Sequence, residues 1–279
     1  MSTDDLPRGI DVASYQGRPD WAAVAASGIR FAFTKATEDV DYTNPTLGHN
    51  WAGIKANGIV RGAYHYARPE RGNSMERAHA EADYFMATVL RAGGLETGDM
   101  LVLDLEPTVR VSGAAAWSLA WLERVERLAG VKPLVYTGPW VIQQQGLDAH
   151  TELGEYGLWL AAYQSTMPRP LAPWDTVAFW QYSSTGRVPG IAGDVDLNVF
   201  NGAPDRLALY GKPGEIVLPV PIPGLMPAQE PDLATLVGVA YHEDGVIIPA
   251  LEGARASGDW SQVDAAVKFL RENNPHRAA

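Results

Sequence analysis

The chain has 279 residues, of which 46% are hydrophobic and 20% are charged, an ordinary composition for a globular protein. Its net charge of −11 and pI of about 5.0 argue against nucleic-acid binding and against polybasic attachment to a membrane. The absence of cysteine excludes disulfides, thiolate metal sites and a cysteine nucleophile. We therefore expect neither nucleic acid nor a membrane as a partner.

The start of the chain, from Met1 to Pro7, is acidic and polar, and it lacks the basic start and apolar core of a signal peptide. No apolar run approaches the ~18 residues that a membrane-spanning helix needs. We expect synthesis in a cytoplasm without a signal peptide and no membrane insertion.

Eight short apolar segments between residues 8 and 200 have the composition of β-strands. In chain order these predicted strands cover residues 9–12, 29–35, 60–66, 100–106, 133–137, 158–163, 177–182 and 195–200. The clearest predicted helices cover residues 21–26, 45–57, 74–92 and 114–128. Strand–helix alternation predicts a parallel sheet, and eight strands predict an α/β fold closed into a TIM-like barrel. Because several later connections are short or irregular, we expect fewer than eight helices.

The end of the chain has a different character. Six prolines within residues 212–231 predict an extended linker between a barrel over residues 1–211 and a segment over residues 232–279. That last segment is patterned as a helix, with Val263, Ala266, Val267 and Leu270 on one face. Its size is marginal for an independent core, so we expect it to pack on the barrel, to self-associate or to form a small helical hairpin of low stability.

The fourth predicted strand ends in two acids, Asp104 and Glu106, before Pro107 blocks its continuation. The i, i+2 spacing places both carboxyls on one face of a strand, about 6–7 Å apart at the backbone. Like charge and partial burial can keep one acid protonated while the other is ionised. This pair is suited to general acid–base chemistry.

The ends of the other strands are also polar. The carboxyl ends of barrel strands meet at one rim, where active sites form. Predicted residues at this rim are Asp11, Lys35, Glu38, Tyr64, His65, Tyr136, Tyr163, Gln181, Asp196 and Asn198. Together with the nearby Trp140, Trp159 and Trp180, these carboxylates describe a site for sugars, whose rings stack on aromatic faces.

Structural alternatives exist for each residue. Asp11 and Asp196 can cap or form turns. Lys35 can pair with Glu38 or with a rim carboxylate, and we favour such a structural pair over a role in catalysis. Tyr64 and Tyr136 are equally suited to packing. No metalloprotease motif, phosphate-binding glycine loop or serine-hydrolase elbow is present, and we expect no metal or cofactor. The acidic helix segment His79-Ala-Glu81-Ala-Asp83 is interpreted as a solvated face.

The ordered set of motifs resembles the family 25 glycoside hydrolases, the Chalaropsis-type lysozymes, which include many bacteriophage endolysins. The resemblance covers about residues 7–203. Its pieces are residues 9–17 (GIDVASYQG), 33–38 (FTKATE), 62–66 (GAYHY), 103–106 (LDLE), 135–137 (VYT), 158–161 (LWLA), 180–182 (WQY) and 195–200 (VDLNVF). It implies a flattened, irregular barrel and an N-acetylmuramidase that cuts the β-1,4 bond between N-acetylmuramic acid and N-acetylglucosamine in peptidoglycan.

The resemblance also implies roles. Glu106 corresponds to the general acid and Asp104 to the group that orients or stabilises the reacting sugar, with Asp11 and Asp196 as the other site carboxylates. The implied substrate-binding residues are Tyr64, Tyr136, Gln181, Trp159, Lys35 and Tyr163. Glu38-Asp39 stands where many members have Glu-Gly, so the loop that follows is expected to differ.

Two rival functions fit parts of the same pattern. One is a barrel hydrolase of chitin-like polymers, since an Asp-x-Glu strand end also serves N-acetylglucosamine chemistry. The other is a wall-binding barrel without activity. Under the favoured hypothesis, a phage lysin is made in the host cytoplasm and reaches the cell wall at lysis, with residues 232–279 as a wall-targeting or self-associating segment.

Overall fold

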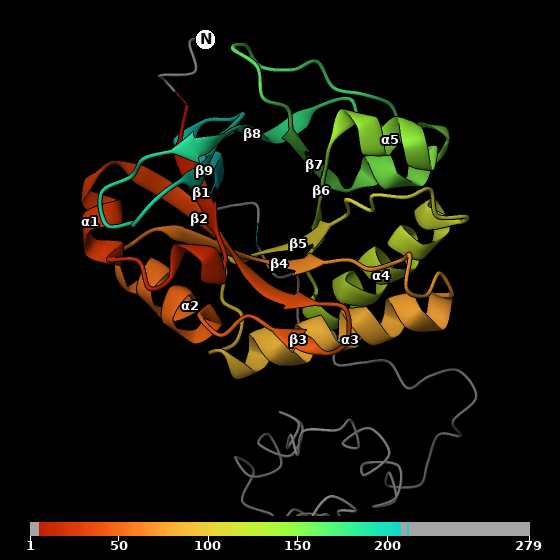
Figure 1. The fold of residues 1–279 in the computed structure, drawn as a ribbon, viewed down its shortest axis with the longest axis horizontal. Coiled ribbons are helices and arrows are strands. Elements are labelled where there is room, and N and C mark those ends of the chain that lie inside the picture. The colour runs from red at the N-terminus through yellow and green to blue at the C-terminus, as the bar shows by residue number, and fades with distance from the viewer. Residues whose placement is uncertain (1–5, 208–210, 212–279) are drawn as a thin grey trace, which may run out of the picture. The chain divides into compact units, whose positions relative to one another are not determined.

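The computed structural model describes residues 6–207 and Gly211, and its ribbon is shown in Figure 1. The predicted Pro-rich linker and C-terminal helical segment lie outside the described residues. Within the described part, no helix combines the length and apolar character needed to cross a membrane.

The described residues form one nine-stranded sheet in the order β1-β9-β8-β7-β6-β5-β4-β2-β3. Because β1 also pairs with β2, eight of these strands close into a barrel and β3 lies at the edge of β2. The closed eight-stranded barrel confirms the predicted fold class. The strands are β1 Arg8–Val12, β2 Ile29–Glu38, β3 Tyr42–Thr43, β4 Val60–Tyr66, β5 Met100–Asp104, β6 Leu134–Thr137, β7 Gly157–Ala161, β8 Val177–Gly186 and β9 Val195–Phe200.

The prediction of a parallel sheet is wrong for the last strand. β9 runs antiparallel to both β8 and β1, whereas the other barrel neighbours are parallel. The connection from Gly186 to Val195 contains no helix, and a short connection of this kind reverses the chain, since a parallel crossover needs a dozen residues or more. Asp196 consequently lies near the start of its strand and still faces the rim.

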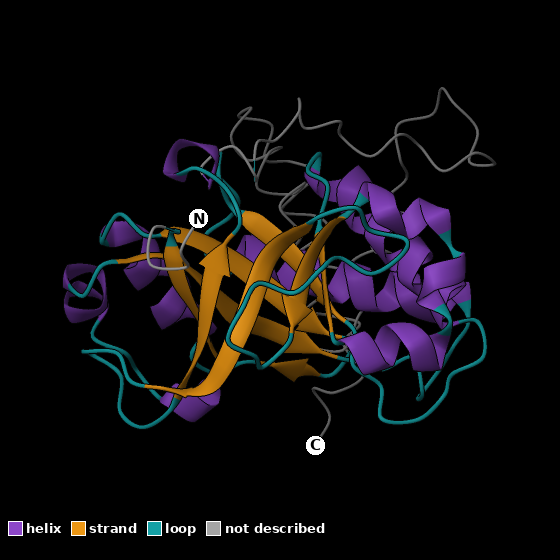
Figure 2. Ribbon diagram, turned by 90° about the horizontal axis from the view of Figure 1, so that it is seen from above, coloured by secondary structure: helices purple, strands orange, loops and turns teal. Residues whose placement is uncertain are grey.

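Helices surround the barrel unevenly. All four predicted helices are present, as α1 Trp21–Ala26, α2 Leu47–Ala56, α3 Met75–Arg91 and α4 Ala114–Ala129, and two short ones follow, α5 Pro139–Gln145 and α6 Pro204–Leu207. Side chains cap two of them: the Asp20 carboxylate accepts from the first turn of α1, and the Ser74 hydroxyl accepts from Arg77 N in α3. Figure 2 shows the strands at the centre, with the longest helices gathered on one side.

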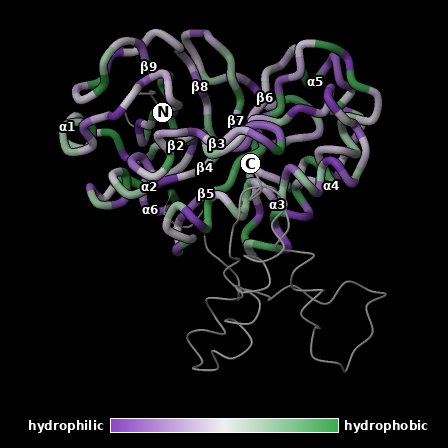
Figure 3. Tube along the Cα trace, turned by 60° about the horizontal axis from the view of Figure 1, so that its bottom comes forward, coloured by the Kyte–Doolittle hydropathy of each residue, from purple (hydrophilic) through white to green (hydrophobic). Residues whose placement is uncertain are grey.

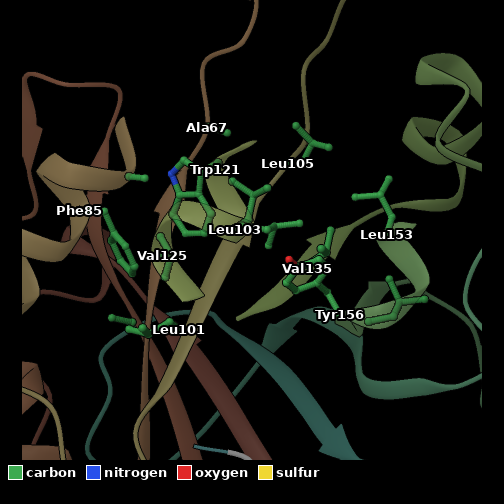
Figure 4. Close-up of a cluster of buried hydrophobic side chains, with 14 of the residues drawn as sticks. Ala67, Phe85, Leu101, Leu103, Leu105, Trp121, Val125, Val135, Leu153 and Tyr156 are labelled. Carbon is green, nitrogen blue, oxygen red and sulfur yellow. The ribbon is translucent and has the colours of Figure 1, made fainter. Parts of the chain in front are cut away.

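The largest core cluster lies between the barrel wall and helices α3 and α4 (Figure 4). Leu101 and Leu103 of β5 meet Phe85 of α3 and Trp121 of α4 there, all of them buried. Figure 3 shows hydrophobic and hydrophilic residues interspersed along the described chain. Since alternate residues of a strand face opposite sides, Met100, Val102 and Asp104 of β5 point into the barrel.

Aromatic rings fill the barrel interior below the rim. Phe31 and Phe33 of β2 contact Phe179, and Phe33 also stacks on Trp159 with ring centroids 4.3 Å apart. Glycines make room for these rings: a Cβ on Gly9 would lie 2.3 Å from Phe31, and one on Gly62 would lie 2.3 Å from Phe33. These rings fill the barrel interior below the ends of the strands that carry the polar residues.

Candidate active site

A pocket of about 330 Å³ opens at the carboxyl end of the parallel strands. This volume falls in the range of small-molecule sites. Its lining includes all ten residues predicted for the site, together with Ala13 and Tyr66, which were not among them. The lining residues are Asp11, Ala13, Lys35, Tyr64, Tyr66, Asp104, Glu106, Tyr136, Trp159, Tyr163, Gln181 and Asp196.

Asp104 and Glu106 line the pocket together, as their i, i+2 spacing predicts. β5 ends at Asp104, but Leu105 N still bonds to Tyr136 O, which extends the alternation to Glu106. Burial raises the pKa of Asp104 well above its usual range, and the charge of Glu106 adds to this shift. Burial also raises the pKa of Glu106, although Lys35 opposes the shift. Both acids therefore hold protons more firmly than they would in water.

Asp11 is the centre of a hydrogen-bond network. Its Oδ2 accepts from Asn198 Nδ2 at 2.7 Å and from Gln181 Nε2 at 2.9 Å. Trp159 Nε1 donates to Asn198 Oδ1 at 2.8 Å, and Tyr136 Oη donates to Gln181 Oε1 at 3.0 Å. Because an indole N–H can only donate, it fixes the Asn198 amide with its NH₂ group toward Asp11. Asn198 stands outside the predicted binding set, although its polar face beside Asp196 had placed it at the rim.

Asp196 directly opposes Asp11 across the β1–β9 pair. Burial and the Asp196 charge raise the pKa of Asp11 to about 8, although the two amide bonds oppose the shift. Burial raises the pKa of Asp196 as well, while its hydrogen bond with Asp11 lowers it. Two carboxyls so close cannot both ionise readily. The pair is best described as sharing one proton at neutral pH.

The predicted ion pair between Lys35 and Glu38 is present. Lys35 Nζ lies 2.6 Å from Glu38 Oε2, and it also lies over the rings of Tyr66 and Tyr42, at 4.7 and 5.2 Å from their centroids. Arg68 donates from Nε to Glu38 Oε1 at 2.8 Å and contacts the same oxygen through Nη2. Glu38 therefore lies between two cations, one of which lines the pocket.

The residue after Glu38 has a backbone conformation that is unusual for a residue other than glycine. Asp39 has a φ of 53°, the left-handed conformation that favours glycine. Its buried carboxylate accepts from its neighbour Val40 N and pairs with Arg71 and Arg77. These bonds hold the loop between β4 and α3, which carries Arg68.

The prediction of a solvated face on α3 is wrong for Glu81, which is fully buried. Glu81 Oε2 lies 2.9 Å from His65 Nε2 and accepts from Arg68 N at 3.1 Å. Burial lowers the pKa of His65, although Glu81 opposes this, and its other ring nitrogen lies 2.8 Å from Thr37 Oγ1. His65 thus points away from the pocket, and its contacts with Thr37 and Glu81 link the barrel wall to α3.

Three tryptophans were expected to present ring faces to sugars, and they have different surroundings. Trp159 lines the pocket from its floor, whereas Trp180 is buried outside the barrel wall and donates to Ala162 O. Trp140 is half exposed at the start of α5. Among the described residues, the exposed aromatic side chains are Tyr15, Trp140 and Tyr163, and each follows a strand end at the rim.

No group of three or more metal-ligating side chains is arranged to hold a metal ion within the described residues. The pocket presents carboxyls, phenols, a side-chain amide and the Lys35 ammonium. Four carboxyls with raised pKa values, of which Asp11 accepts from two side-chain amides, are suited to proton transfer on a polar substrate.

Known proteins share this sequence and fold. An Escherichia coli K12 protein, uncharacterized protein YegX, is 38% identical over 72% of this chain and 72% of its own. Lysozyme M1 of Streptomyces globisporus is 33% identical over 72% of this chain and 69% of its own. The crystal structure of a lysozyme from Streptomyces coelicolor aligns with a TM-score of 0.64 and 32% identity, covering 73% of this chain and 96% of that one.

The model of the glycosyl hydrolases family 25 matches residues 10–191. This range extends from Ile10 in β1 to Ile191 in the loop before β9. This match covers well over half of the chain and includes three of the four pocket carboxyls. The protein therefore belongs to glycosyl hydrolase family 25.

Proposed function

We propose that this protein is an N-acetylmuramidase that hydrolyses the β-1,4 bond between N-acetylmuramic acid and N-acetylglucosamine in peptidoglycan, with Glu106 as the proton donor. The observation that carries the proposal is the pocket with four carboxyls in a family 25 glycoside hydrolase. The lysozymes of both Streptomyces species support the choice of substrate.

Glu106 is suited to give its proton to the oxygen that leaves with N-acetylglucosamine. Burial raises its pKa, so it is protonated at a higher pH than a carboxyl in water. The bond from that oxygen to the anomeric carbon breaks as the proton moves. Water then adds to the anomeric carbon and returns a proton to the Glu106 carboxylate, which restores the enzyme.

Asp104 is suited to orient the reacting sugar. Its Oδ1 is buried and has no hydrogen-bond partner among the described residues. A buried polar atom without a partner is costly, and an acetamido N–H of the substrate would satisfy it. The Asp11–Asp196 pair carries one negative charge across the pocket and is suited to stabilise the positive charge that develops on the sugar ring.

The remaining predicted contacts form the walls of the pocket. Lys35, Tyr64 and Tyr136 lie on three neighbouring or nearby strands, and the Gln181 amide is held by the hydroxyls of Tyr136 and Tyr163, each at 3.0 Å. Trp159 gives the pocket an aromatic floor. We propose these six residues as the substrate-binding set.

Mass analysis of fragments released from defined peptidoglycan tests this function. We expect products with new muramic-acid reducing ends and no release from chitin. Reducing ends on N-acetylglucosamine, or cleavage of chitin at a comparable rate, would favour the rival hydrolase. Absence of any product from purified walls would favour a binding protein without activity.

We further propose a role in phage lysis, in which the enzyme is made in the host cytoplasm, is released at lysis and carries a barrel over residues 1–211, a linker and a C-terminal segment over residues 232–279. Family membership and the helical pattern of the last segment support wall targeting or self-association. A chain ending at Gly211 should then bind walls less tightly or change its oligomeric state. Unchanged wall binding, activity and oligomeric state would contradict this role.

A further inference from the structure

The ion-pair cluster beside the pocket consists of Lys35, Glu38 and Arg68, and its geometry is unusual for a pocket full of acids. Lys35 is the one lysine or arginine that lines the described pocket, beside the carboxyls of Asp104 and Glu106. Its ammonium is nevertheless bonded to Glu38, at 2.6 Å. The Lys35 ammonium, which could neutralise the catalytic acids, is therefore paired with an acid outside the pocket, Glu38.

Several contacts fix this arrangement. The bulge in β2 between Lys35 and Thr37 changes the register against β4, and bulges redirect side chains. Arg68 holds the other oxygen of Glu38, and its own backbone N–H is held by the buried Glu81. The rings of Tyr42 and Tyr66 cover the Lys35 ammonium. Glu38 thus has a firm position between two cations.

We propose that Glu38 is a positioning residue for the hydrolysis: it holds the Lys35 ammonium on its own carboxylate and so prevents this cation from pairing with Asp104 and Glu106. The proposal rests on the assignment of Glu106 as the proton donor. A direct pair with Lys35 would favour the ionised form of Glu106 and remove the proton that the reaction uses.

The charges around Glu106 are consistent with this role. Lys35 lowers the pKa of both Asp104 and Glu106, and Glu38 raises that of Asp104. Burial raises the pKa of Glu38, but the bonds from Lys35 and Arg68 outweigh it, so that Glu38 stays ionised. The groups facing Glu106 are the phenols of β4 and β6, the acids Asp11, Asp104 and Asp196, and the cations Lys35 and Arg68.

The pH profile of kcat on a soluble peptidoglycan oligosaccharide tests the proposal with Glu38→Gln. Removing the Glu38 charge leaves Lys35 free to approach the pocket acids, so the loss of activity on the alkaline side should move about one pH unit lower. Above that pH, activity should be about tenfold below wild type, with acid-side kcat and KM nearly unchanged. A merely structural role would lower Tm without moving the alkaline limb.

Glu70→Gln is the matched control. Glu70 also pairs with Arg68, at 3.2 Å, but it makes no bond to Lys35. This variant should keep the wild-type pH profile, and an equal shift in both variants would contradict the specific role of Glu38. Lys35→Met should move the alkaline limb to higher pH, and the Lys35→Met/Glu38→Gln double variant should keep the Lys35→Met profile, because Glu38 acts through Lys35.

Failure of the proposal for Glu38 can be distinguished from failure of the assignment of Glu106 as the proton donor. If folded Glu38→Gln keeps the wild-type alkaline limb while Glu106→Gln is inactive, the proposal for Glu38 is overturned and the function stands. If Glu106→Gln itself hydrolyses walls at the wild-type rate, the proton-donor assignment fails, and the proposal for Glu38 fails with it.

Discussion

Buried aspartates have different partners at the two ends of the barrel. At the closed end, Asp99 is 6% exposed and receives a two-pronged bond from Arg61, with both N···O distances at 2.8 Å. At the open end, Asp11 and Asp104 are 7% and 5% exposed, and neither forms a salt bridge in the described part of the chain. Aspartates that are equally buried therefore form a salt bridge at the closed end and none at the open end in the described part of the chain.

The difference lies in what accompanies each acid. Arg61 also donates to Trp51 O and stacks on the Trp51 ring at 3.9 Å, so the Asp99 pair is fully bonded. Around Asp11 and Asp104, the neighbours are amides, phenols and other acids, and the nearby cation, Lys35, is paired with Glu38. Charge compensation stabilises the closed end, whereas its absence at the open end maintains the raised pKa values that proton transfer requires.

Glu106→Gln should show the largest effect at the open end. The amide has the shape of the acid but cannot give up a proton, so kcat on peptidoglycan should fall by about 10³-fold or more. Tm should be maintained or should rise, because a buried acid is removed. Normal wall lysis by the folded variant would refute the proton-donor assignment.

Asp99→Asn, at the closed end, should lower stability and leave activity unchanged. It leaves the Arg61 guanidinium buried without its counter-charge, which costs about 3 kcal/mol in the free energy of unfolding. Urea denaturation measures this loss, and kcat per folded molecule at low temperature should match wild type. A loss of activity without a loss of stability would mean that the two ends are not separate in function.

Asp11→Asn should have a smaller effect on rate and a pH-dependent effect on stability. Below pH about 8, Asp11 is largely protonated, and an amide can replace its hydroxyl as a donor to Asp196, so kcat should fall only about tenfold. The folded-state pKa is raised above its unfolded value, so the wild type loses stability as pH rises from about 4 to about 8.

The Asp11→Asn variant has no carboxyl at this position to ionise. It should therefore not lose stability in this way as the pH rises. The gain in unfolding free energy over wild type should therefore be larger at pH 8 than at pH 5, measured by urea denaturation at both values. A gain that is the same at both pH values would contradict the raised pKa.

Trp140→Ala should have the smallest effect. A Cβ on Gly138 would lie 3.3 Å from the Trp140 ring, which places the half-exposed ring beside the end of β6. If the ring stacks on a sugar away from the cleaved bond, KM on long glycans should rise about threefold, with little change on a short oligosaccharide. Leu90→Ala, at the end of α3 toward the closed end, is the matched control and should change neither value.

Alternation along single strands predicted much of the site. Asp104 and Glu106 share a face with Val102, and this same-face argument holds even though β5 ends before Glu106. The same argument would have placed Trp180 correctly, because Gln181 faces the pocket and its neighbour must face outward. For Glu81, the spacing of Ala78, Glu81, Ala82 and Phe85 at i, i+3, i+4 and i+7 already put it on the apolar face of α3.

Other features depend on pairing between distant segments. The direction of β9 could not be read from its sequence, because alternation has the same period in both directions. Likewise, the bond from Asn198 to Asp11 joins residues 187 positions apart, and only the closed barrel brings them together. The Glu38–Arg68 contact depends on the loop that Asp39 holds through its arginine partners.

The pairing of β1 with β9 also determines when the site can exist during protein synthesis. Arg8 lies opposite Val199 and Asp11 opposite Asp196, so β1 can pair with β2 early, but its second partner, β9, is the last strand of the barrel to be synthesised. An incomplete chain has Asp104 and Glu106 but lacks the second acid pair and a closed barrel wall. The barrel wall can therefore close, and Asp11 and Asp196 can come together, only after β9 has been synthesised.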